Sequence, residues 1–257
     1  MCVCQDHYYF FAADNIHRPD GMPVTQEVDQ DLILNMYDID PAVSRYFWHP
    51  SMGQGASSAV CPEEDPAKQA KWMTKASGIH DIFPDAAIHE TMFEPCGYSM
   101  NGIEGEAYHT IHITPESHCS YASFETNANL ASYSALTEKV VSTFRPGRFS
   151  LLFFADENCP INIESNRLES EQGESLQCLL EQSKVTHSCL NRAAGTAYST
   201  HLNPRKDSYW AVEGYRNKCL SFHEFGPGYY VVLANYVKDD GSNGGLSPQA
   251  PGGAVWR

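Results

Sequence analysis

Short apolar segments with strand-like composition follow one another along this chain, interrupted by a few segments with helical spacing. We predict strands over 7–14, 90–101, 107–114, 120–126, 148–155, 208–213, 218–223 and 229–237. We predict helices over 28–37, where apolar residues fall at 28, 32, 33 and 36, and over 67–76 and 133–144. Sequential strands with few crossovers indicate an α+β fold, a mostly antiparallel sheet with helices on one face.

Three polar regions shape the domain prediction. Residues 50–66 are rich in Gly, Ser, Ala and acids and predict an exposed loop insertion, while 157–204 is predicted as loops with some helix near 175–183. The Gly/Pro/Ser-rich stretch 239–257 predicts a disordered tail. The sequence therefore predicts one domain over 1–238.

Composition and charge narrow the classes of function. The chain has 257 residues, is 42% hydrophobic and carries a net charge of −15 without a basic stripe, which favours a folded protein and argues against a nucleic-acid partner. No apolar run reaches the roughly 18 residues of a membrane span, and the N-terminus lacks the pattern of a signal peptide. Nine scattered cysteines, whose only close pair is Cys2 and Cys4, indicate reduced thiols in the cytoplasm and no metal centre.

The densest group of polar residues lies between Phe93 and Asn127. Ser99 stands among small and polar residues, and a histidine follows thirteen residues later. Residues two apart share one face of a strand, and that face would carry Tyr108, Thr110, His112, Thr114 and then Glu116. A hydroxyl, an imidazole and a carboxylate would thus converge across a hairpin, as general acid–base chemistry on a serine or a cationic substrate requires.

The residues alone leave the reaction open. A histidine on a strand is commonly a structural residue, and the spacing of Ser99 and His112 is no hydrolase motif, because no G-x-S-x-G elbow is present. The patterns by themselves predict an α+β protein with a polar site.

Three strings in this region resemble consecutive motifs of the eukaryotic-type, pyruvoyl-dependent S-adenosylmethionine decarboxylases. They are MFEPCGYSMNG at 92–102, TIHITPE at 110–116 and SYASFETN at 120–127. The resemblance continues upstream at 38–43 and 77–84 and downstream at 145–149 and 213–216, and it covers roughly His7 to Lys238.

The resemblance implies a fold and a chemistry. The family fold is a four-layer αββα sandwich of two similar halves, with the active site between the sheets, and this chain would supply one half. Family members are lyases that decarboxylate S-adenosylmethionine for spermidine and spermine biosynthesis. Their cofactor is a covalent pyruvoyl group (pyruvate), made by autocatalytic cleavage of a zymogen, which forms a Schiff base with the substrate.

The resemblance also implies roles for individual residues. His112 would be the base that removes the α-proton of the cleavage serine during ester elimination, and Ser99 would stabilise the cyclic intermediate before the ester. Phe93 would stack on the adenine and lie near the sulfonium cation. Glu116 would bind the ribose hydroxyls.

Some members of the family are activated by putrescine, a dication held by buried acids. Asp29 and Glu125 match two of these acids, whereas Ile33 stands where the third is expected. A homodimer, or a heterodimer with a paralogue, is compatible with the resemblance.

The family's Glu-Ser-Ser cleavage motif is expected upstream of His7 and is not in this sequence; Ser57 and Ser58 have the wrong flanks. The family's catalytic cysteine and second stacking phenylalanine belong to the same missing N-terminal half, and Cys96 does not take that cysteine's role. The favoured interpretation is therefore the substrate-binding half of a decarboxylase, inactive on its own. The alternatives are a catalytically incomplete regulatory partner, which the retained Ser99 and His112 count against, and a stand-alone adenosyl-binding module.

Overall fold

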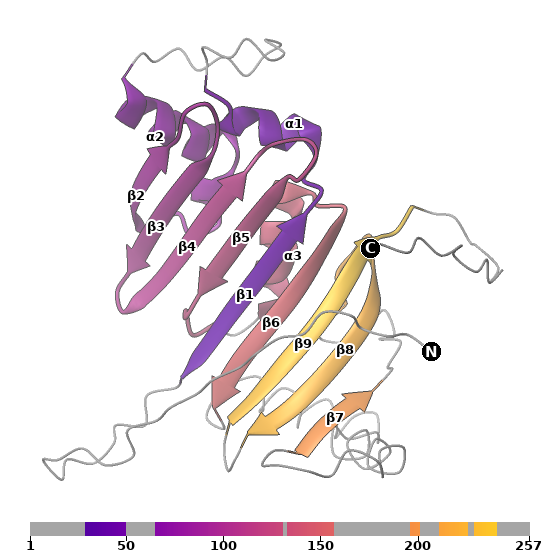
Figure 1. Cartoon of the computed structure of the whole chain (residues 1–257). Coiled ribbons are helices and arrows are strands. Elements are labelled where there is room, and N and C mark those ends of the chain that lie inside the picture. The colour runs from indigo at the N-terminus through magenta and orange to yellow at the C-terminus, as the bar shows by residue number, and fades with distance from the viewer. Residues whose placement is uncertain are drawn as a thin grey trace, which may run out of the picture.

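A single antiparallel sheet runs through the whole described part of the molecule (Figure 1). The computed structural model describes residues 29–49, 65–130, 133–156, 196–200, 211–225 and 229–240. Within these residues nine strands follow the order β2-β3-β4-β5-β1-β6-β9-β8-β7. Their bounds are β1 Gln30–Tyr37, β2 Ala87–Met92, β3 Tyr98–Glu104, β4 Ala107–Thr114, β5 Tyr121–Thr126, β6 Arg148–Asp156, β7 Thr196–Thr200, β8 Tyr215–Phe225 and β9 Tyr229–Lys238.

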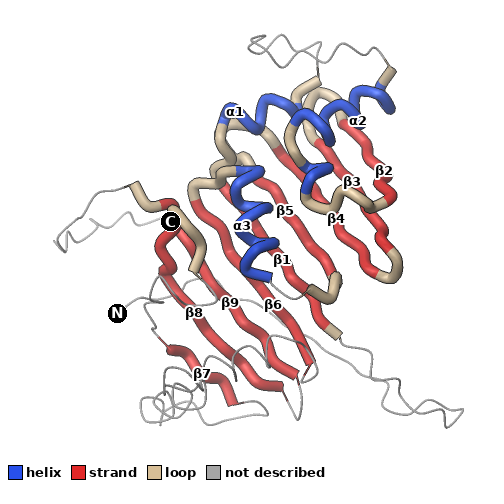
Figure 2. Tube along the Cα trace, turned by 180° about the vertical axis from the view of Figure 1, so that it is seen from behind, coloured by secondary structure: helices blue, strands red, loops and turns tan. Residues whose placement is uncertain are grey.

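Helices cover one face of this sheet, as Figure 2 shows from behind. They are α1 Pro41–Ser44, α2 Pro66–Ala76 and α3 Tyr133–Phe144, with short 3₁₀ turns η1 Arg45–Phe47 and η3 Ile79–Asp81. Helix α2 begins where Asp65 accepts hydrogen bonds from the amides of Ala67 and Lys68, at 2.8 and 3.3 Å, with proline at the first helical position. The predicted α+β class, with helices on one face of an antiparallel sheet, is confirmed.

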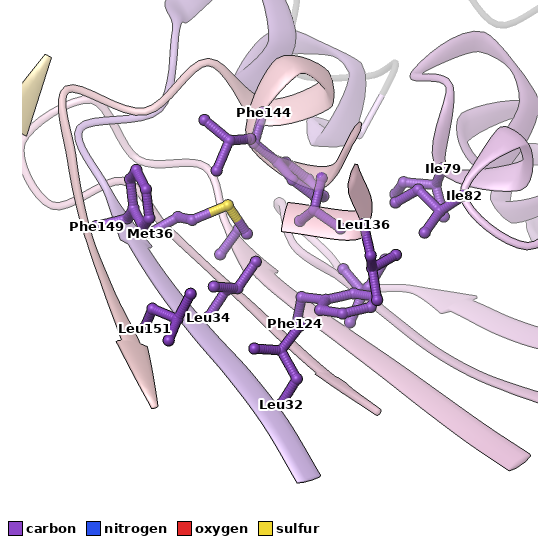
Figure 3. Close-up of a cluster of buried hydrophobic side chains, with 14 of the residues drawn as sticks. Leu32, Leu34, Met36, Ile79, Ile82, Phe124, Leu136, Phe144, Phe149 and Leu151 are labelled. Carbon is purple, nitrogen blue, oxygen red and sulfur yellow. The ribbon is translucent and has the colours of Figure 1, made fainter. Parts of the chain in front are cut away.

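The core lies between the sheet and these helices (Figure 3). Alternate residues of β1, namely Leu32, Leu34 and Met36, are fully buried there, and α3 contributes Leu136 and Phe144. Full burial of one such side chain stabilises the fold by about 1.5–3 kcal/mol. This layer therefore holds the central strands in register.

The helix predicted over 28–37 is wrong, because residues Gln30–Tyr37 form the central strand β1. Its burial alternates strictly, so that Leu32 and Leu34 face the helices while Ile33 faces the other side. The strand pairs with β5 on one edge and β6 on the other. Apolar residues at 32, 33 and 36 fit a helix as well as a strand, and this two-sided pairing decides between them.

The strand predicted over 90–101 is in fact the end of β2 and the start of β3. The amide of Phe93 donates to the carbonyl of Gly97 at 3.0 Å, which closes a tight loop between the two strands. Gly97 has φ +116°, a conformation that favours glycine. Gly97 therefore marks a break between two strands, where a single continuous strand was predicted.

The other predicted elements are either confirmed, wrong, or outside the described residues. The helices predicted over 67–76 and 133–144 and the strands over 107–114, 120–126, 148–155, 218–223 and 229–237 are confirmed within a few residues. Two predictions were wrong: β7 lies in a stretch predicted as loops and helix, and residues 211–213 are not a strand. The strand predicted over 7–14, nearly all of the loop insertion at 50–66, the helix near 175–183 and the tail from 241 onward lie outside the described residues.

A buried histidine, His109, packs on the helix-covered face of the sheet. His109 is 2% exposed and packs on Phe83, with ring centroids 4.7 Å apart. Its ring fills the space above Gly102, its cross-strand partner, where any Cβ would clash with the imidazole. Burial lowers the pKa of His109 to about 4.

None of the described helices is both long and apolar enough to cross a membrane.

Candidate functional site

The sheet face away from the helices carries a serine–histidine pair. Ser99 of β3 and His112 of β4 are direct cross-strand partners, and Ser99 Oγ lies 3.1 Å from His112 Nδ1. His112 is exposed and Ser99 half-buried, so a ligand can reach both. The predicted convergence of hydroxyl and imidazole is confirmed, and this hydrogen bond orients the imidazole ring.

Glu116 lies just past the end of β4, in a turn, and does not extend the strand as predicted. The amide of Cys119 donates to the carbonyl of Glu116 at 3.0 Å and closes this turn. The Oε2 atom of the Glu116 side chain is buried without a hydrogen-bond partner among the described residues. Buried polar atoms are ordinarily paired, so this oxygen is an acceptor open to a donor from a ligand.

Phe93 presents its ring just past the end of β2, in the loop that leads to β3. It is 50% exposed, one of two large hydrophobic side chains in the described part of the chain that are so open. A Cβ at Gly97 would meet the Phe93 ring at 3.6 Å, so the ring lies close to the backbone that leads into Ser99. An exposed aromatic ring of this kind offers a stacking surface.

A cluster of acids occupies the same sheet face near the other end of β4. The Tyr108 hydroxyl donates to Glu125 Oε1 at 2.8 Å. Burial, followed by the charges of Glu125 and Asp29, raises the pKa of Asp31 to about 7. The two acids predicted from the sequence, Asp29 and Glu125, are therefore brought together around Asp31.

Asp31 lies in this acidic cluster, and the sequence patterns did not single it out. In the predicted helix, Asp29 and Ile33 would lie one turn apart and Asp31 would point elsewhere. In the observed strand, Asp31 and Ile33 share one face, and Asp29 directly precedes the strand. Recognising the strand would have been enough to find this carboxylate.

A band of polar side chains crosses the sheet on the open face. Each residue is the registered partner of the next across five strand pairs, in the order Ser99, His112, Ser123, Asn35, Ser150 and Asn235. Tyr121 donates to Asn35 Oδ1 at 2.6 Å, and the Ser150 hydroxyl donates to Asn235 Oδ1 at 2.6 Å. The band places the Ser99–His112 pair in polar surroundings.

No group of three or more His, Cys, Asp or Glu side chains in the described segments is arranged to hold a metal ion.

Comparison with known proteins agrees with this geometry. The family model described as adenosylmethionine decarboxylase matches residues 2–237. The chain belongs to the adenosylmethionine decarboxylase family. The resemblance of the motifs around Ser99, His112 and Glu125 is thereby confirmed at the level of the family.

Alignment with individual members of the adenosylmethionine decarboxylase family shows what share of each relative's length this chain covers. It is 35% identical over 240 residues to an S-adenosylmethionine decarboxylase proenzyme of Leishmania infantum, covering 92% of this chain and 48% of the relative. It is 40% identical over 159 residues to that of Dictyostelium discoideum, covering 62% and 37%. The chain spans about half the length of the curated relatives that it matches.

A solved member of the adenosylmethionine decarboxylase family shares the fold. The crystal structure of the Trypanosoma brucei AdoMetDC-delta26 monomer matches with a TM-score of 0.54 and 26% sequence identity. The match covers 82% of this chain and 66% of that one. The likeness supports the α+β architecture built above.

Proposed function

We propose that this chain is the substrate-binding half of an S-adenosylmethionine decarboxylase, a carboxy-lyase that serves spermidine and spermine biosynthesis in the cytoplasm. The observation that carries the proposal is the 3.1 Å contact of Ser99 Oγ with His112 Nδ1 on the open sheet face. Family membership over residues 2–237 supports it. Catalysis would then need residues that this sequence does not contain.

Phe93 and Glu116 are proposed to hold the adenosyl group. The half-exposed ring of Phe93 would stack on the adenine and lie near the sulfonium, where a cation gains on the order of 0.5–2 kcal/mol from a ring face. The unpartnered Oε2 of Glu116 would accept a hydrogen bond from a ribose hydroxyl. The two groups flank the loop that leads into Ser99 and would orient the substrate toward it.

Ser99 and His112 are proposed to act in the self-processing that generates the cofactor. His112 would take the α-proton of the cleavage serine during ester elimination, and Ser99 would hydrogen-bond to the oxygen of the cyclic intermediate that precedes the ester. The polar, accessible surroundings of the pair fit a pyruvoyl carbonyl, which supplies an electron sink for decarboxylation. Once the group is formed, the same two side chains would lie beside it.

The acidic cluster is the proposed site of a putrescine activator. A diamine carries two positive charges, and one ammonium would lie between Glu125 and Asp31, with Asp29 close by. Asp31 would supply a carboxylate on the face where Ile33 offers none. Binding of a cation would favour ionised Asp31 and so lower its raised pKa.

Decarboxylation and self-cleavage are tested together. The chain is expressed alone and together with the N-terminal half of a trypanosomatid relative, and release of labelled CO₂ from carboxyl-labelled S-adenosylmethionine is measured. Activity only in the combined preparation, lost in His112→Ala, supports the proposal. Activity of the chain alone contradicts the proposed half-site. If neither preparation is active but the chain stimulates a separate decarboxylase, as a paralogue partner would, the regulatory alternative replaces the proposal.

A further inference from the structure

The loop that carries Phe93 is exposed, and its orientation depends on contacts from elsewhere in the chain. Residues 93–97 join β2 to β3, and the amide of Phe93 donates to the carbonyl of Gly97 at 3.0 Å. This bond closes the loop, but residues 93–95 all remain exposed. Exposed segments with few packed side chains open easily, so the orientation of the Phe93 ring depends on what else the loop contacts.

Residues 47–49, at the end of η1, support the loop through the backbone. The amide of Gly97 donates to the carbonyl of Phe47 at 2.9 Å. The amide of His49 donates to the carbonyl of Pro95 at 3.0 Å. Together these two bonds form an isolated antiparallel bridge, so the segment lies alongside the loop as a very short strand would.

This supporting segment is itself fixed to the core. Phe47 is fully buried, and its ring centroid lies 5.4 Å from that of Tyr98. The Tyr98 hydroxyl shares a hydrogen bond of 2.6 Å with the hydroxyl of Thr74 on α2. The backbone bridge therefore connects the exposed loop to the helix-covered core.

His49 adds a side-chain contact to the backbone bridge. Its Nε2 lies 3.4 Å from Oε1 of Glu94, and the two form an ion pair when the imidazole is protonated. The side chain of His49 is 17% exposed and that of Glu94 is 78% exposed, so the histidine is the anchored partner and the acid is the restrained one. Glu94 directly follows Phe93, and the contact therefore restrains the loop at the residue next to the ring.

We propose that His49 is a positioning residue that holds Glu94 and thereby orients the adjacent Phe93 ring for stacking on an adenine. The inference rests on the proposed function for the identity of the ligand, but not for the contact between His49 and Glu94. A ring that is already oriented loses less conformational freedom when a ligand stacks on it, so the contact favours binding. Glutamine, whose amide nitrogen lies near the place of the imidazole Nε2, can replace His49, and alanine cannot.

The effect on the loop is tested without a ligand. Exchange of the amide hydrogens of Phe93 and Gly97, which close and anchor the loop, is followed by NMR in the full 257-residue chain. We expect exchange about threefold faster in His49→Ala and in Glu94→Ala, the range for the loss of one exposed ion pair, and wild-type rates in His49→Gln. Because Glu94 is exposed, Glu94→Ala still tests the contact if His49→Ala does not fold.

The matched control is His80→Ala. His80 Nδ1 lies 3.8 Å from Asp81 Oδ1, and this histidine–acid pair belongs to η3, outside the loop and outside residues 47–49. The control should leave both exchange rates unchanged. Wild-type exchange in both His49→Ala and Glu94→Ala overturns the proposal.

The consequence for binding is tested by a double-mutant cycle, with affinities measured by isothermal titration calorimetry. His49→Ala should bind S-adenosylmethionine about threefold more weakly, while His49→Gln and His80→Ala keep wild-type affinity. In a Phe93→Leu background, which lacks the aromatic ring, His49→Ala should cause no further loss, because its effect passes through that ring.

The outcomes separate the positioning role from the proposed function. A threefold loss that persists in the Phe93→Leu background, or equal losses in the alanine and glutamine variants, overturns the positioning role. Faster exchange of the loop with unchanged affinity overturns it as well. If the wild type does not bind S-adenosylmethionine, the proposed function fails for this chain, and the exchange rates still decide whether His49 restrains the loop.

Discussion

The two faces of one sheet carry opposite chemistry in this protein. On β5 the buried Phe124 contributes to the core, while the adjacent Ser123 belongs to the polar band on the open face. The helix-covered face is apolar and contains only occasional polar groups such as His109, whereas the open face gathers Ser99, His112 and the acids. Along the same strand, alternate residues therefore stabilise the core on one face and line the candidate site on the other.

The largest effect is expected from truncating the core face. Phe124→Ala removes a fully buried ring and should lower the free energy of unfolding by about 3–5 kcal/mol. The neighbouring Ser123→Ala, on the open face, should change it by no more than about 0.5 kcal/mol. Urea unfolding followed by circular dichroism measures both, and similar values for the two variants would contradict the division of the sheet into two faces.

A substitution on the open face should impair self-processing and leave the free energy of unfolding almost unchanged. His112→Ala should slow self-processing by about 100- to 10,000-fold, the usual contribution of a general base, in a preparation that supplies the cleavage motif. Because the side chain is exposed, the free energy of unfolding should stay within about 0.5 kcal/mol of the wild type. Gel analysis of chain cleavage measures the first and urea unfolding the second. A variant that processes normally contradicts the assigned base.

The buried His109 makes the apolar face sensitive to acid. Its folded pKa of about 4 lies below the ordinary 6.5, so the unfolded chain takes up the proton first. The stability that depends on neutral His109 is therefore complete above pH 6.5 and is lost as pH falls toward 4, by on the order of 3 kcal/mol.

His109→Phe, which keeps a ring above Gly102, should remove this part of the pH dependence. Thermal unfolding of both proteins between pH 7.5 and 4.5 provides the measurement. Parallel curves for the wild type and the variant would show that the folded and unfolded states take up the His109 proton equally, which contradicts a lowered pKa in the folded state.

The smallest effect is expected from Asp31 and has the opposite sign. Its folded pKa of about 7 lies above the ordinary 3.8, so ionisation in the folded state carries a penalty that grows as pH rises from 3.8 through 7. Asp31→Asn should therefore be more stable than the wild type at pH 8 and not at pH 4. Solvent screening of the partly exposed carboxylate should reduce the roughly 4 kcal/mol that the full pKa shift implies to on the order of 1 kcal/mol.

The response to putrescine provides a second comparison of the wild type with Asp31→Asn. The diamine should raise the melting temperature of the wild type at pH 8 more than that of Asp31→Asn, because the variant lacks the carboxylate that the cation would stabilise. Equal shifts in the two proteins would remove Asp31 from the proposed activator site.

Much of the fold was accessible from local patterns. The amphipathic spacing of Leu136, Val140 and Val141 predicted α3 within its observed bounds, and the alternation around His112 predicted β4. Strand β1 was missed because its apolar cluster fits two periods and the choice depends on partners far away in the chain. Asp31 was missed for the same reason, since its place depends on the period of that strand.

For the candidate site, the sequence predicted only the shared face of one strand and its contact with the next strand of the hairpin. The Ser99–His112 pair was foreseen as a hairpin contact, and the register makes it a direct one. The band through Asn35 and Ser150 depends on pairings between strands more than a hundred residues apart, which no local pattern contains. The break between β2 and β3 was missed because Gly97, whose φ of +116° marks it, lies in a stretch predicted as continuous strand.

In the proposed function, the open face binds the adenosyl substrate near the loop after β2 and the turn after β4. Deuterium exchange of the chain with and without S-adenosylmethionine tests it most directly. We predict slower exchange over 93–101 and 112–119 and no change in α3 on the opposite face. Protection confined to α3, or unchanged exchange everywhere under saturating ligand, would contradict the account.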